Sequence, residues 1–301
     1  MLPFDDRDGV IWMNGEFVEW KDAKIHVLTH GLHYASAVFE GERAYNGEVF
    51  KMTEHHARLH KSANLMDFEI PYSVEEIDAV TMALLEKNGI VDGYVRPVAW
   101  RGSEMMGVSG QKNKVNMAIA AWEWPAYFSP EARMQGIRMA FAKYQRPNPA
   151  SAPVHSKAAG LYMICTLSKH EAEAKGYNDA LMLDWRGQVA EATGANIFLV
   201  QDGELHTPTP DCFLDGITRR TVIDLAKSFG YAVIERPIMP EEFANTQEVF
   251  LTGTAVEVTP VRAIGDYQFT PGDVTFKLLN AYDELVARGD KKAAAAASSA
   301  A

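Results

Sequence analysis

Cysteine, basic charge and long apolar runs are all in short supply in this chain. Its 301 residues include two cysteines, Cys165 and Cys212, too few for a disulfide scaffold and without the paired spacing of a zinc site. Lysine and arginine number 29 against 40 aspartates and glutamates, which gives a formal net charge of −11. Because a negative chain repels phosphate backbones and anionic lipid, nucleic acid is not expected as a partner.

Membrane and export signals are also missing from the pattern. Apolar segments such as residues 117–122 are far too short to span a bilayer. The first thirty residues carry acidic Asp5, Asp6 and Asp8 and show no basic segment ahead of an apolar core. We therefore expect a cytoplasmic protein with no membrane association, and with both cysteines reduced and packed.

What is present is the pattern of a mixed globular fold. Dipeptides of Asn-Gly or Asp-Gly at residues 14–15, 46–47 and 202–203 adjoin apolar or alternating segments and predict two-residue hairpins. Apolar and β-branched residues predict further strands at 94–100, 114–122, 136–142, 180–184 and 248–252. Ser73 and Glu76 form a capping box for a helix that ends near Asn88-Gly89, and Thr53 is expected to cap another helix.

This mixture predicts an α+β (mixed α/β) chain with two domains, in which helices flank antiparallel and mixed sheets. A proline-bounded segment without periodicity at 125–130 is the best candidate for a linker. We therefore expect a smaller N-terminal domain over residues 1–124, a linker over 125–135 and a larger C-terminal domain over 136–290. Residues 291–301 form a low-complexity alanine and serine tail.

Two ionisable residues stand out by their neighbours. Lys157 is flanked by small uncharged residues ahead of a predicted helix, where it could be desolvated and lose its proton, as imine chemistry requires. A solvated lysine at a helix start is the alternative. Glu191 is surrounded by alanine, threonine and glycine that offer it no cation, so a pyridinium nitrogen would compensate it; a helix or turn cap is the alternative.

Possible anion sites come next. Gly216, Ile217 and Thr218 precede a predicted helix, so backbone amides and a hydroxyl would converge at its N-terminus. A second glycine and threonine turn covers residues 252–255, and Arg58 at the edge of a helix could reach a phosphate. Taken singly, each feature has an ordinary alternative, namely a capped loop, a hairpin or a surface arginine.

Alternation along two predicted strands places polar and aromatic groups together. Phe39, Gly41 and Arg43 would share one face, with glycine leaving a gap between the ring and the cation. Tyr94 and Arg96 would present a hydroxyl and a guanidinium side by side, which suits a carboxylate ligand. A sheet face with a salt bridge is the alternative.

Together these residues resemble the class IV aminotransferases that use pyridoxal 5′-phosphate (PLP), and most closely the branched-chain amino acid aminotransferases. The strongest match is a signature of spaced positions from Glu191 through Asn196, Phe198, Leu205, Thr207 and Leu214 to Gly216, Ile217 and Arg219. Agreement extends from His33-Tyr34 to Pro260 and covers roughly residues 10–285. The sequence departs from the pattern at Leu161, often asparagine in relatives, and at Ala195, often glutamate.

The resemblance implies fold type IV, like that of D-amino acid aminotransferases, and a role for each matched residue. Lys157 would be the catalytic lysine that binds the cofactor as an imine and carries the proton. The other cofactor-binding residues would be Arg58, Tyr162, Glu191, Leu214, Gly216, Ile217, Thr218 and Thr254. Substrate-binding residues would be Tyr34, Phe39, Gly41, Arg43, Tyr94, Arg96, Tyr127, Thr254 and Ala255. In this assignment Glu191 pairs with the pyridine nitrogen, and Arg96 and Tyr34 meet the side-chain carboxylate of glutamate.

The implied activity is ping-pong transfer of the amino group of leucine, isoleucine or valine to 2-oxoglutarate, by a homodimer or higher homo-oligomer whose partners are small amino acids and 2-oxo acids. Enzymes of the same fold remain as alternatives: a D-amino acid aminotransferase, an (R)-amine transaminase or an aminodeoxychorismate lyase. A catalytically silent binding protein of this fold is a further possibility.

A metal-dependent hydrolase would instead use the histidines, which are His26, His30, His33, His55, His56 and His60. No His-Glu-x-x-His arrangement accompanies them, so no metal site is expected.

Overall fold

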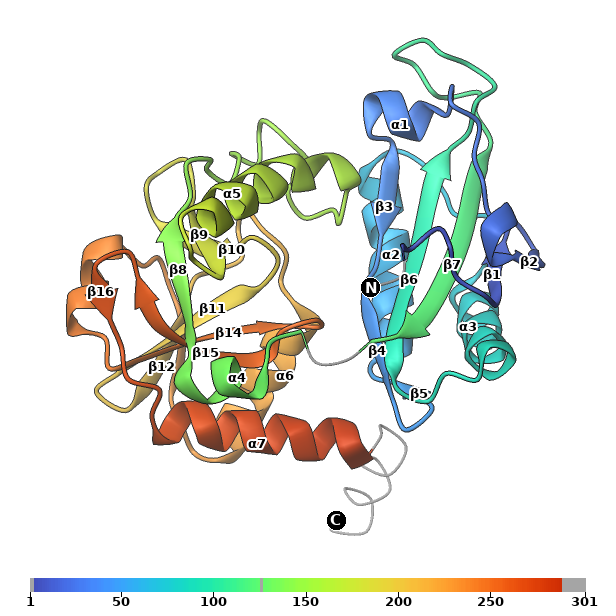
Figure 1. The fold of residues 1–301 in the computed structure, drawn as a ribbon. Helices are drawn as coiled ribbons and strands as arrows, with labels where there is room; N and C mark the ends of the chain where they lie inside the picture. Colours follow the sequence, from blue (N-terminus) through green and yellow to red (C-terminus); the bar gives the residue numbers. More distant parts are fainter. Residues whose placement is uncertain (1–2, 125–126, 289–301) are drawn as a thin grey trace. The chain divides into compact units, whose positions relative to one another are not determined.

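The computed structural model describes residues 3–124 and 127–288, which divide into two compact units (Figure 1). Of the described residues, unit 1 holds 3–124, 156–160 and 287–288, and unit 2 holds 127–155 and 161–286. Two details differ from the expected domain boundaries. The segment 125–135 contains the helix α4 (Pro130–Gln135), and residues 156–160 return to unit 1. The expected tail at 291–301 lies outside the described residues.

Unit 1 is built on a seven-stranded antiparallel sheet in the order β2-β1-β7-β6-β4-β5, with β3 also paired to β6. Its strands are β1 (Val10–Met13), β2 (Glu16–Glu19), β3 (Ala37–Phe39), β4 (Glu42–Tyr45), β5 (Glu48–Val49), β6 (Gly93–Arg101) and β7 (Val115–Glu123). Its helices are η1 (Trp20–Asp22), α1 (His30–Tyr34), α2 (Met52–Leu65) and α3 (Val74–Asn88).

Unit 2 carries a nine-stranded mixed sheet in the order β10-β9-β8-β15-β14-β11-β12-β13, with β16 paired to β15. Its strands are β8 (Ile137–Phe141), β9 (Asp179–Leu183), β10 (Val189–Ala192), β11 (Asn196–Gln201), β12 (Glu204–Thr207), β13 (Val233–Glu235), β14 (Glu248–Gly253), β15 (Glu257–Ile264) and β16 (Tyr267–Gln268). The helices are α4, α5 (Tyr162–Ala174), α6 (Ile217–Ser228), η3 (Pro240–Asn245) and α7 (Asp273–Arg288), whose last two residues belong to unit 1; η2 (Ala159–Leu161) bridges the unit boundary.

The three predicted hairpins are confirmed at the residues that require left-handed backbone. Residues 14–15 join β1 to β2, 46–47 join β4 to β5, and 202–203 join β11 to β12. In the first of these turns φ is 52° at Asn14 and 98° at Gly15, which is the two-residue turn whose twist matches antiparallel strands. These short-range signals therefore fix the register of each hairpin.

The helices of unit 1 show one confirmed cap and one wrong one. The Ser73 hydroxyl accepts from the backbone N–H of Glu76, whose carboxylate accepts from the N–H of Ser73, and Gly89 ends the helix at φ 64°. Thr53 does not cap α2, which begins after Lys51. Its hydroxyl donates instead to Asp78 on α3 at 2.6 Å, because a bond to a charged acceptor is stronger than one to a neutral backbone group.

Packing leaves one face of the unit 1 sheet for polar chemistry. The helices α2 and α3 cover the other face, where Leu59 and Ile77 join Val95 and Ala99 of β6 in one buried core. Since side chains alternate along a strand, Tyr94 and Arg96 lie on the opposite face from Val95. The sheet thus separates the apolar core from the predicted substrate residues.

Unit 2 encloses a second apolar core, formed around its central strands and including Ile197, Leu199, Val249 and Leu251.

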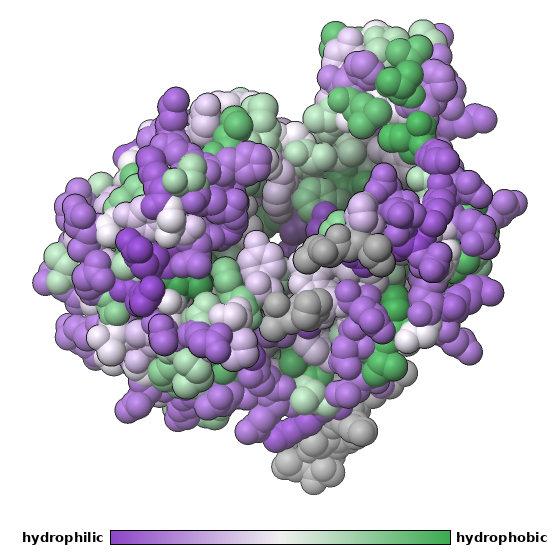
Figure 2. All heavy atoms as spheres, viewed as in Figure 1, coloured by the Kyte–Doolittle hydropathy of each residue, from purple (hydrophilic) through white to green (hydrophobic). Residues whose placement is uncertain are grey.

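Both cysteines are free and buried. Among the described residues, no helix combines the length and apolarity needed to cross a bilayer. On the face seen in Figure 2, hydrophilic residues predominate over each unit, with smaller apolar areas among them.

Candidate active site

Lys157 lies in unit 1, on a short segment that runs beside β3. Its carbonyl accepts from the backbone N–H of Phe39 at 3.2 Å, and its own N–H donates to the Ser62 hydroxyl at 3.0 Å. The Ser156 hydroxyl donates to the carbonyl of Ser62 at 2.9 Å. A strand on one side and a helix on the other therefore fix the backbone at the lysine.

The amine of Lys157 is enclosed although the residue as a whole is half-buried. Burial lowers the pKa of Lys157. Glu40 acts against this shift and Arg58 adds to it, and the net pKa lies below the usual value. A lowered pKa increases the fraction of neutral amine, which is the form that attacks a carbonyl. The enclosed amine agrees with the desolvation expected of this lysine, and its catalytic role stays a prediction.

A buried ion pair lies next to this lysine. The fully buried Glu40 carboxylate accepts from Arg58 Nε at 2.7 Å and Arg58 Nη2 at 2.8 Å, and from His55 Nδ1 at 2.8 Å. These contacts hold the pKa of Glu40 well below its ordinary range, against the opposing effect of burial. Arg58, predicted to bind phosphate, is therefore fixed in orientation by a carboxylate that the sequence did not single out.

The predicted substrate residues of β3, β4 and β6 come together on the face of the unit 1 sheet that lies opposite its apolar core. Arg96 Nη2 donates to the Tyr94 hydroxyl at 3.2 Å, and its guanidinium carbon lies 4.8 Å from the centroid of the Phe39 ring. The same ring lies 5.5 Å from Lys157 Nζ. An aromatic face, a guanidinium and an amine thus converge.

Gly41 is glycine because the Tyr94 hydroxyl occupies the space of a side chain. A Cβ built at Gly41 would lie 1.9 Å from Tyr94 Oη, far inside van der Waals contact. Arg43 pairs across the strands with Tyr94 and is buried. Within the part of the chain that the structure describes, its Nε and Nη1 have no hydrogen-bond partner, so this site holds an unsatisfied donor set that an anion could accept from.

Two predicted substrate tyrosines are more exposed. Tyr34 ends α1, is 43% exposed, and donates to the carbonyl of Met106 at 3.3 Å. Tyr127, in unit 2, is 41% exposed and packs edge to face on Phe128. These contacts give neither tyrosine a direct link to a substrate group, so the substrate role of both stays a prediction.

Unit 2 carries Glu191 on β10, and here the sequence interpretation was wrong about charge. Arg146 Nε lies 3.4 Å from Glu191 Oε1, so a buried guanidinium accompanies the carboxylate that its sequence neighbours left without a cation. Asn196 Nδ2 donates to Glu191 Oε2 at 3.3 Å. Arg146 was not apparent from the sequence because it reaches Glu191 from the segment that follows β8.

The loop and helix start that were predicted to bind phosphate adjoin Glu191 through Asn196. Asn196 Nδ2 also donates to the carbonyl of Leu214 at 3.0 Å, and a Cβ built at Gly216 would lie 2.2 Å from Asn196 Oδ1. Gly216 is the N-cap of α6 and makes no side-chain cap bond. The buried Ile217 and Thr218 begin this helix, whose N-terminal amides and dipole suit an anion.

Two more predicted residues of unit 2 lie near these elements. Thr254 and Ala255 form the turn between β14 and β15, and β14 pairs with β11 so that Thr252 faces Asn196. Tyr162 is the first residue of α5 and acts electrostatically on Arg146. Unit 2 therefore carries on neighbouring elements the residues that were predicted to contact the cofactor ring, the cofactor phosphate and the substrate carboxylate.

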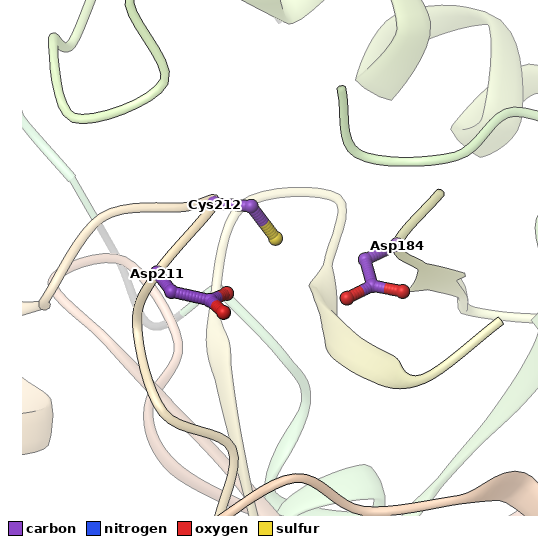
Figure 3. A group of neighbouring side chains, drawn as sticks. All are labelled: Asp184, Asp211 and Cys212. Atoms are coloured by element: carbon purple, nitrogen blue, oxygen red, sulfur yellow. The ribbon is translucent and has the colours of Figure 1, made fainter. Parts of the chain in front are cut away.

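Two of the histidines considered as metal ligands are engaged in ion pairs. His55 and His56 pair with Glu40, Glu42 and Asp78 inside unit 1. Across the described residues, the single group of three potential ligands within 4.8 Å of one another is Asp184, Asp211 and Cys212 (Figure 3). Arg186 donates to both of its carboxylates at 2.7 Å, so a guanidinium already offsets part of their charge.

The sequence patterns did not reveal the roles of Glu40, Arg146 and Asn196. Glu40 and Asn196 stood inside matched motifs, so their position was a usable signal although their contacts were not visible. Arg146 stands outside every motif, between Gln145 and Pro147. Its contact with Glu191 depends on which strands are neighbours, and local patterns do not contain that information.

Comparison with known proteins places these features in one family. The family model for class IV aminotransferases matches residues 37–264. The branched-chain-amino-acid aminotransferase of Pseudomonas aeruginosa is 42% identical over 288 residues, which cover 93% of this chain and 94% of that protein.

Solved structures agree with this similarity. The branched-chain amino acid aminotransferase of Escherichia coli has a TM-score of 0.90 and 38% identity, covering 93% of this chain and 95% of that one. A branched-chain amino acid aminotransferase from T.th., solved with pyridoxamine 5′-phosphate, has a TM-score of 0.91 and 39% identity, covering 95% of this chain and 97% of that one. The predicted fold is confirmed, and the chain belongs to the family of class IV aminotransferases.

Proposed function

We propose that this protein uses PLP to transfer the amino group of leucine, isoleucine or valine to 2-oxoglutarate by a ping-pong route. Relatives named for branched-chain amino acids and structures titled with phosphopyridoxyl compounds support this activity. The single observation that carries it is the enclosed amine of Lys157, with its lowered pKa, beside Phe39 and Arg96.

The residues present fit the cofactor. When bound, PLP supplies a conjugated ring that accepts the electron pair released at the substrate Cα. Lys157 Nζ would hold the cofactor and, as a neutral amine, would take up and return the proton at the substrate Cα. Glu191 would pair with the ring nitrogen and favour its protonated form. Because burial lowers the pKa of Lys157, less free energy is needed to give the neutral amine that acts as a base.

Phosphate binding is assigned to groups within each unit. In unit 1, Arg58 contributes a guanidinium whose orientation is fixed by Glu40. In unit 2, the N-terminal amides of α6 at Ile217 and Thr218 add backbone donors, and the Thr254 turn adds a hydroxyl. Tyr162 and Leu214 are assigned to the cofactor ring. These donors are typical of phosphate sites, in which amides and guanidinium share the charge.

Substrate binding divides between apolar and charged contacts. Phe39 and Tyr127 offer apolar surface to a branched side chain, and Arg96 offers a cation to the side-chain carboxylate of glutamate, with Tyr34 as its partner. Tyr94 and the turn at Thr254-Ala255 are assigned to the substrate α-carboxylate. Gly41 and Arg43 are assigned to the substrate site beside Tyr94. The Tyr94 hydroxyl already accepts from Arg96, so a carboxylate can replace or extend this contact without rearranging the sheet.

The working form is proposed to be a homodimer or a larger homo-oligomer in the cytoplasm. Apolar side chains at the surface of unit 1 support association: Val108 is 83% exposed, Val27 is 70% exposed and Leu32 is 61% exposed. Such surface is costly to leave in water. Light scattering of the purified chain should give at least twice the 33.4 kDa mass of one chain; a single-chain mass would contradict this assignment.

Visible spectroscopy tests the proposed activity. The purified protein with added PLP should absorb in the visible range as an imine, and borohydride should abolish that band irreversibly. Leucine should convert the band to that of the aminated cofactor, and 2-oxoglutarate should restore it. A panel that includes D-alanine, an (R)-amine and aminodeoxychorismate separates the other activities of this fold. A band that leucine leaves unchanged and D-alanine converts would contradict the proposal.

A further inference from the structure

We propose that Arg146 is a positioning residue that keeps Glu191 ionised before the cofactor binds, so that the arriving ring nitrogen meets a carboxylate and not a carboxylic acid. This inference rests on the proposed function, in which Glu191 faces that nitrogen. Arg146 belongs to no predicted motif and is assigned no contact with the substrate.

Arg146 is built into unit 2 at both its backbone and its side chain. Its N–H donates to the carbonyl of Leu183 at 2.8 Å, and it forms a parallel bridge with Asp184. The residue is 4% exposed. Its Nη1 lies 3.6 Å from Cys165 Sγ, and its Nε lies 3.4 Å from Glu191 Oε1. Because the backbone is anchored to β9, the guanidinium is held at Glu191 without support from the cofactor.

Glu191 is held from a second side. Asn196 Nδ2 donates to Glu191 Oε2 at 3.3 Å and to the carbonyl of Leu214 at 3.0 Å. An amide fixes the orientation of the carboxylate but adds no net charge. The positive charge at this pair comes from Arg146, since a guanidinium stays protonated in proteins. Arg146 and Asn196 therefore have different tasks at the two oxygens.

Other titratable groups around the pair are Cys165 and Tyr162 on α5 and Cys212 before α6, with Asp179, Asp184 and Asp211 farther out. Burial raises the pKa of Cys165 to about 11 and that of Cys212 to about 12, so both thiols are neutral near pH 7. Burial lowers the pKa of Arg146, but Glu191 and these neighbours raise it by more. None of these groups supplies positive charge in place of Arg146.

The consequence is a difference in what the empty pocket offers the cofactor. A carboxyl group in a buried site without a cation takes up a proton, because burial disfavours its charged form. Such an acid would face a protonated ring nitrogen as a second donor, and it would have to release its proton before it could accept from that nitrogen. With Arg146 beside it, Glu191 stays ionised and accepts the proton-bearing nitrogen directly.

The test measures the protonation of Glu191 and not turnover. The infrared carboxyl band of the full-length chain freed of PLP is followed from about pH 5 to about pH 9, the range into which buried carboxyl groups shift. Subtraction of the Glu191→Gln spectrum assigns the band. In the unaltered chain no Glu191 acid band should appear. In Arg146→Met, which keeps an apolar stem, the band should appear and titrate about three pH units above an ordinary glutamate.

Cofactor affinity gives the second readout. In Arg146→Met, PLP binding should weaken relative to the unaltered chain by about tenfold for each pH unit below the new carboxyl pKa, because Glu191 must then release a proton before it can accept from a protonated ring nitrogen. Arg146→Lys keeps a cation and is the matched control, with no acid band and the same pH dependence of PLP affinity as the unaltered chain. If Arg146→Met does not fold, the unaltered chain and Arg146→Lys still decide the matter, since an acid band in either near pH 7 overturns the inference.

Failure of this inference differs from failure of the proposed function. If Glu191 stays ionised in Arg146→Met, Arg146 has only a packing role, whereas Glu191→Gln should still slow the reaction with leucine. If Glu191→Gln leaves that reaction unchanged, Glu191 does not face the ring nitrogen, whatever the infrared titration shows.

Discussion

The two units hold their functional charges in opposite ways. In unit 1 a buried carboxylate, Glu40, fixes a cation that is assigned to the cofactor, Arg58. In unit 2 a buried guanidinium, Arg146, accompanies a carboxylate that is assigned to the cofactor, Glu191. In each case the visible motif residue depends on a counter-charge of opposite sign from another element. This arrangement lets a charged group exist away from water before any ligand arrives.

The two ion pairs differ in the reactive group that each one affects. The Glu40 pair adjoins Lys157 and influences its pKa in both directions, so unit 1 adjusts an amine that must lose a proton. The Arg146 pair maintains a carboxylate that must keep its charge. Unit 1 therefore supports an amine, Lys157, that gains and loses a proton, and unit 2 supports a carboxylate, Glu191, that stays ionised.

Replacing Lys157, the group that carries the proton, should have the largest effect. Lys157→Ala should remove the imine absorption band and lower kcat by about 10⁴-fold or more, because both the covalent link and the proton carrier are lost. Absorption spectra and leucine turnover measure the two losses. Lys175→Ala, which removes an exposed lysine after α5, is the control. Full activity of Lys157→Ala would contradict the role of Lys157 as the residue that binds the cofactor and carries the proton.

Removing the counter-charge of unit 1 should mainly lower stability. Glu40→Ala leaves Arg58 without its buried carboxylate, and breaking such a pair costs about 3–5 kcal/mol of the free energy of unfolding. Urea unfolding measures the loss, with the exposed Glu16→Ala as control. A cost equal to that of the control would show that the Glu40 pair does not organise unit 1.

The fixed charge of unit 2 should matter less for folding and more for rate. Glu191→Gln keeps the shape and a hydrogen bond but loses the charge, so the protein should retain cofactor while the reaction with leucine slows by about a hundredfold. Single-turnover spectroscopy measures this rate. An unchanged rate with normal cofactor content is the contradicting outcome.

Arg96 sharpens the comparison within unit 1, since it serves the substrate and not the cofactor. Arg96→Met should weaken kcat/KM for glutamate by about thirtyfold, which corresponds to about 2 kcal/mol for a lost charged hydrogen bond. The reaction with leucine, measured on the same preparation, is the internal control. Equal losses for leucine and glutamate would refute a role in reading the side-chain carboxylate.

The smallest effect concerns a histidine outside the site. Burial lowers the pKa of His56, but Glu42 and then Asp78 raise it by more, so its pKa in the folded protein is raised. A raised folded pKa stabilises the protein below the unfolded value of about 6.5, and this contribution is lost as pH rises through the folded pKa. Melting temperature should therefore fall across that interval, and His56→Gln should flatten the dependence relative to exposed His170→Gln. An identical pH dependence in both variants would contradict the effect.

Local signals in the sequence predicted local structure well. The turn at Asn14-Gly15 and the capping box at Ser73 depend on residues a few positions apart, and both are confirmed. The expected cap at Thr53 is wrong because Asp78 on another helix takes its hydroxyl. The resemblance identified the family, and matched motifs pointed to residues that do lie together in each unit.

Long-range contacts account for what the sequence could not predict. Residues 156–160 pair with β3 and so belong to unit 1, although they follow the predicted linker. Arg146 lies beside Glu191 because strands β8, β9 and β10 are neighbours in the sheet. Neither fact has a signature in spacing or composition, because each depends on the order of strands in space.

The most direct test of the proposed mechanism identifies the amine that holds the cofactor. The protein is treated with PLP and borohydride, digested, and mapped by mass spectrometry. We expect a pyridoxyl group on the peptide that contains Lys157, and no such label when leucine is added before the reductant. A label on a different lysine, or none, would contradict the central role of Lys157.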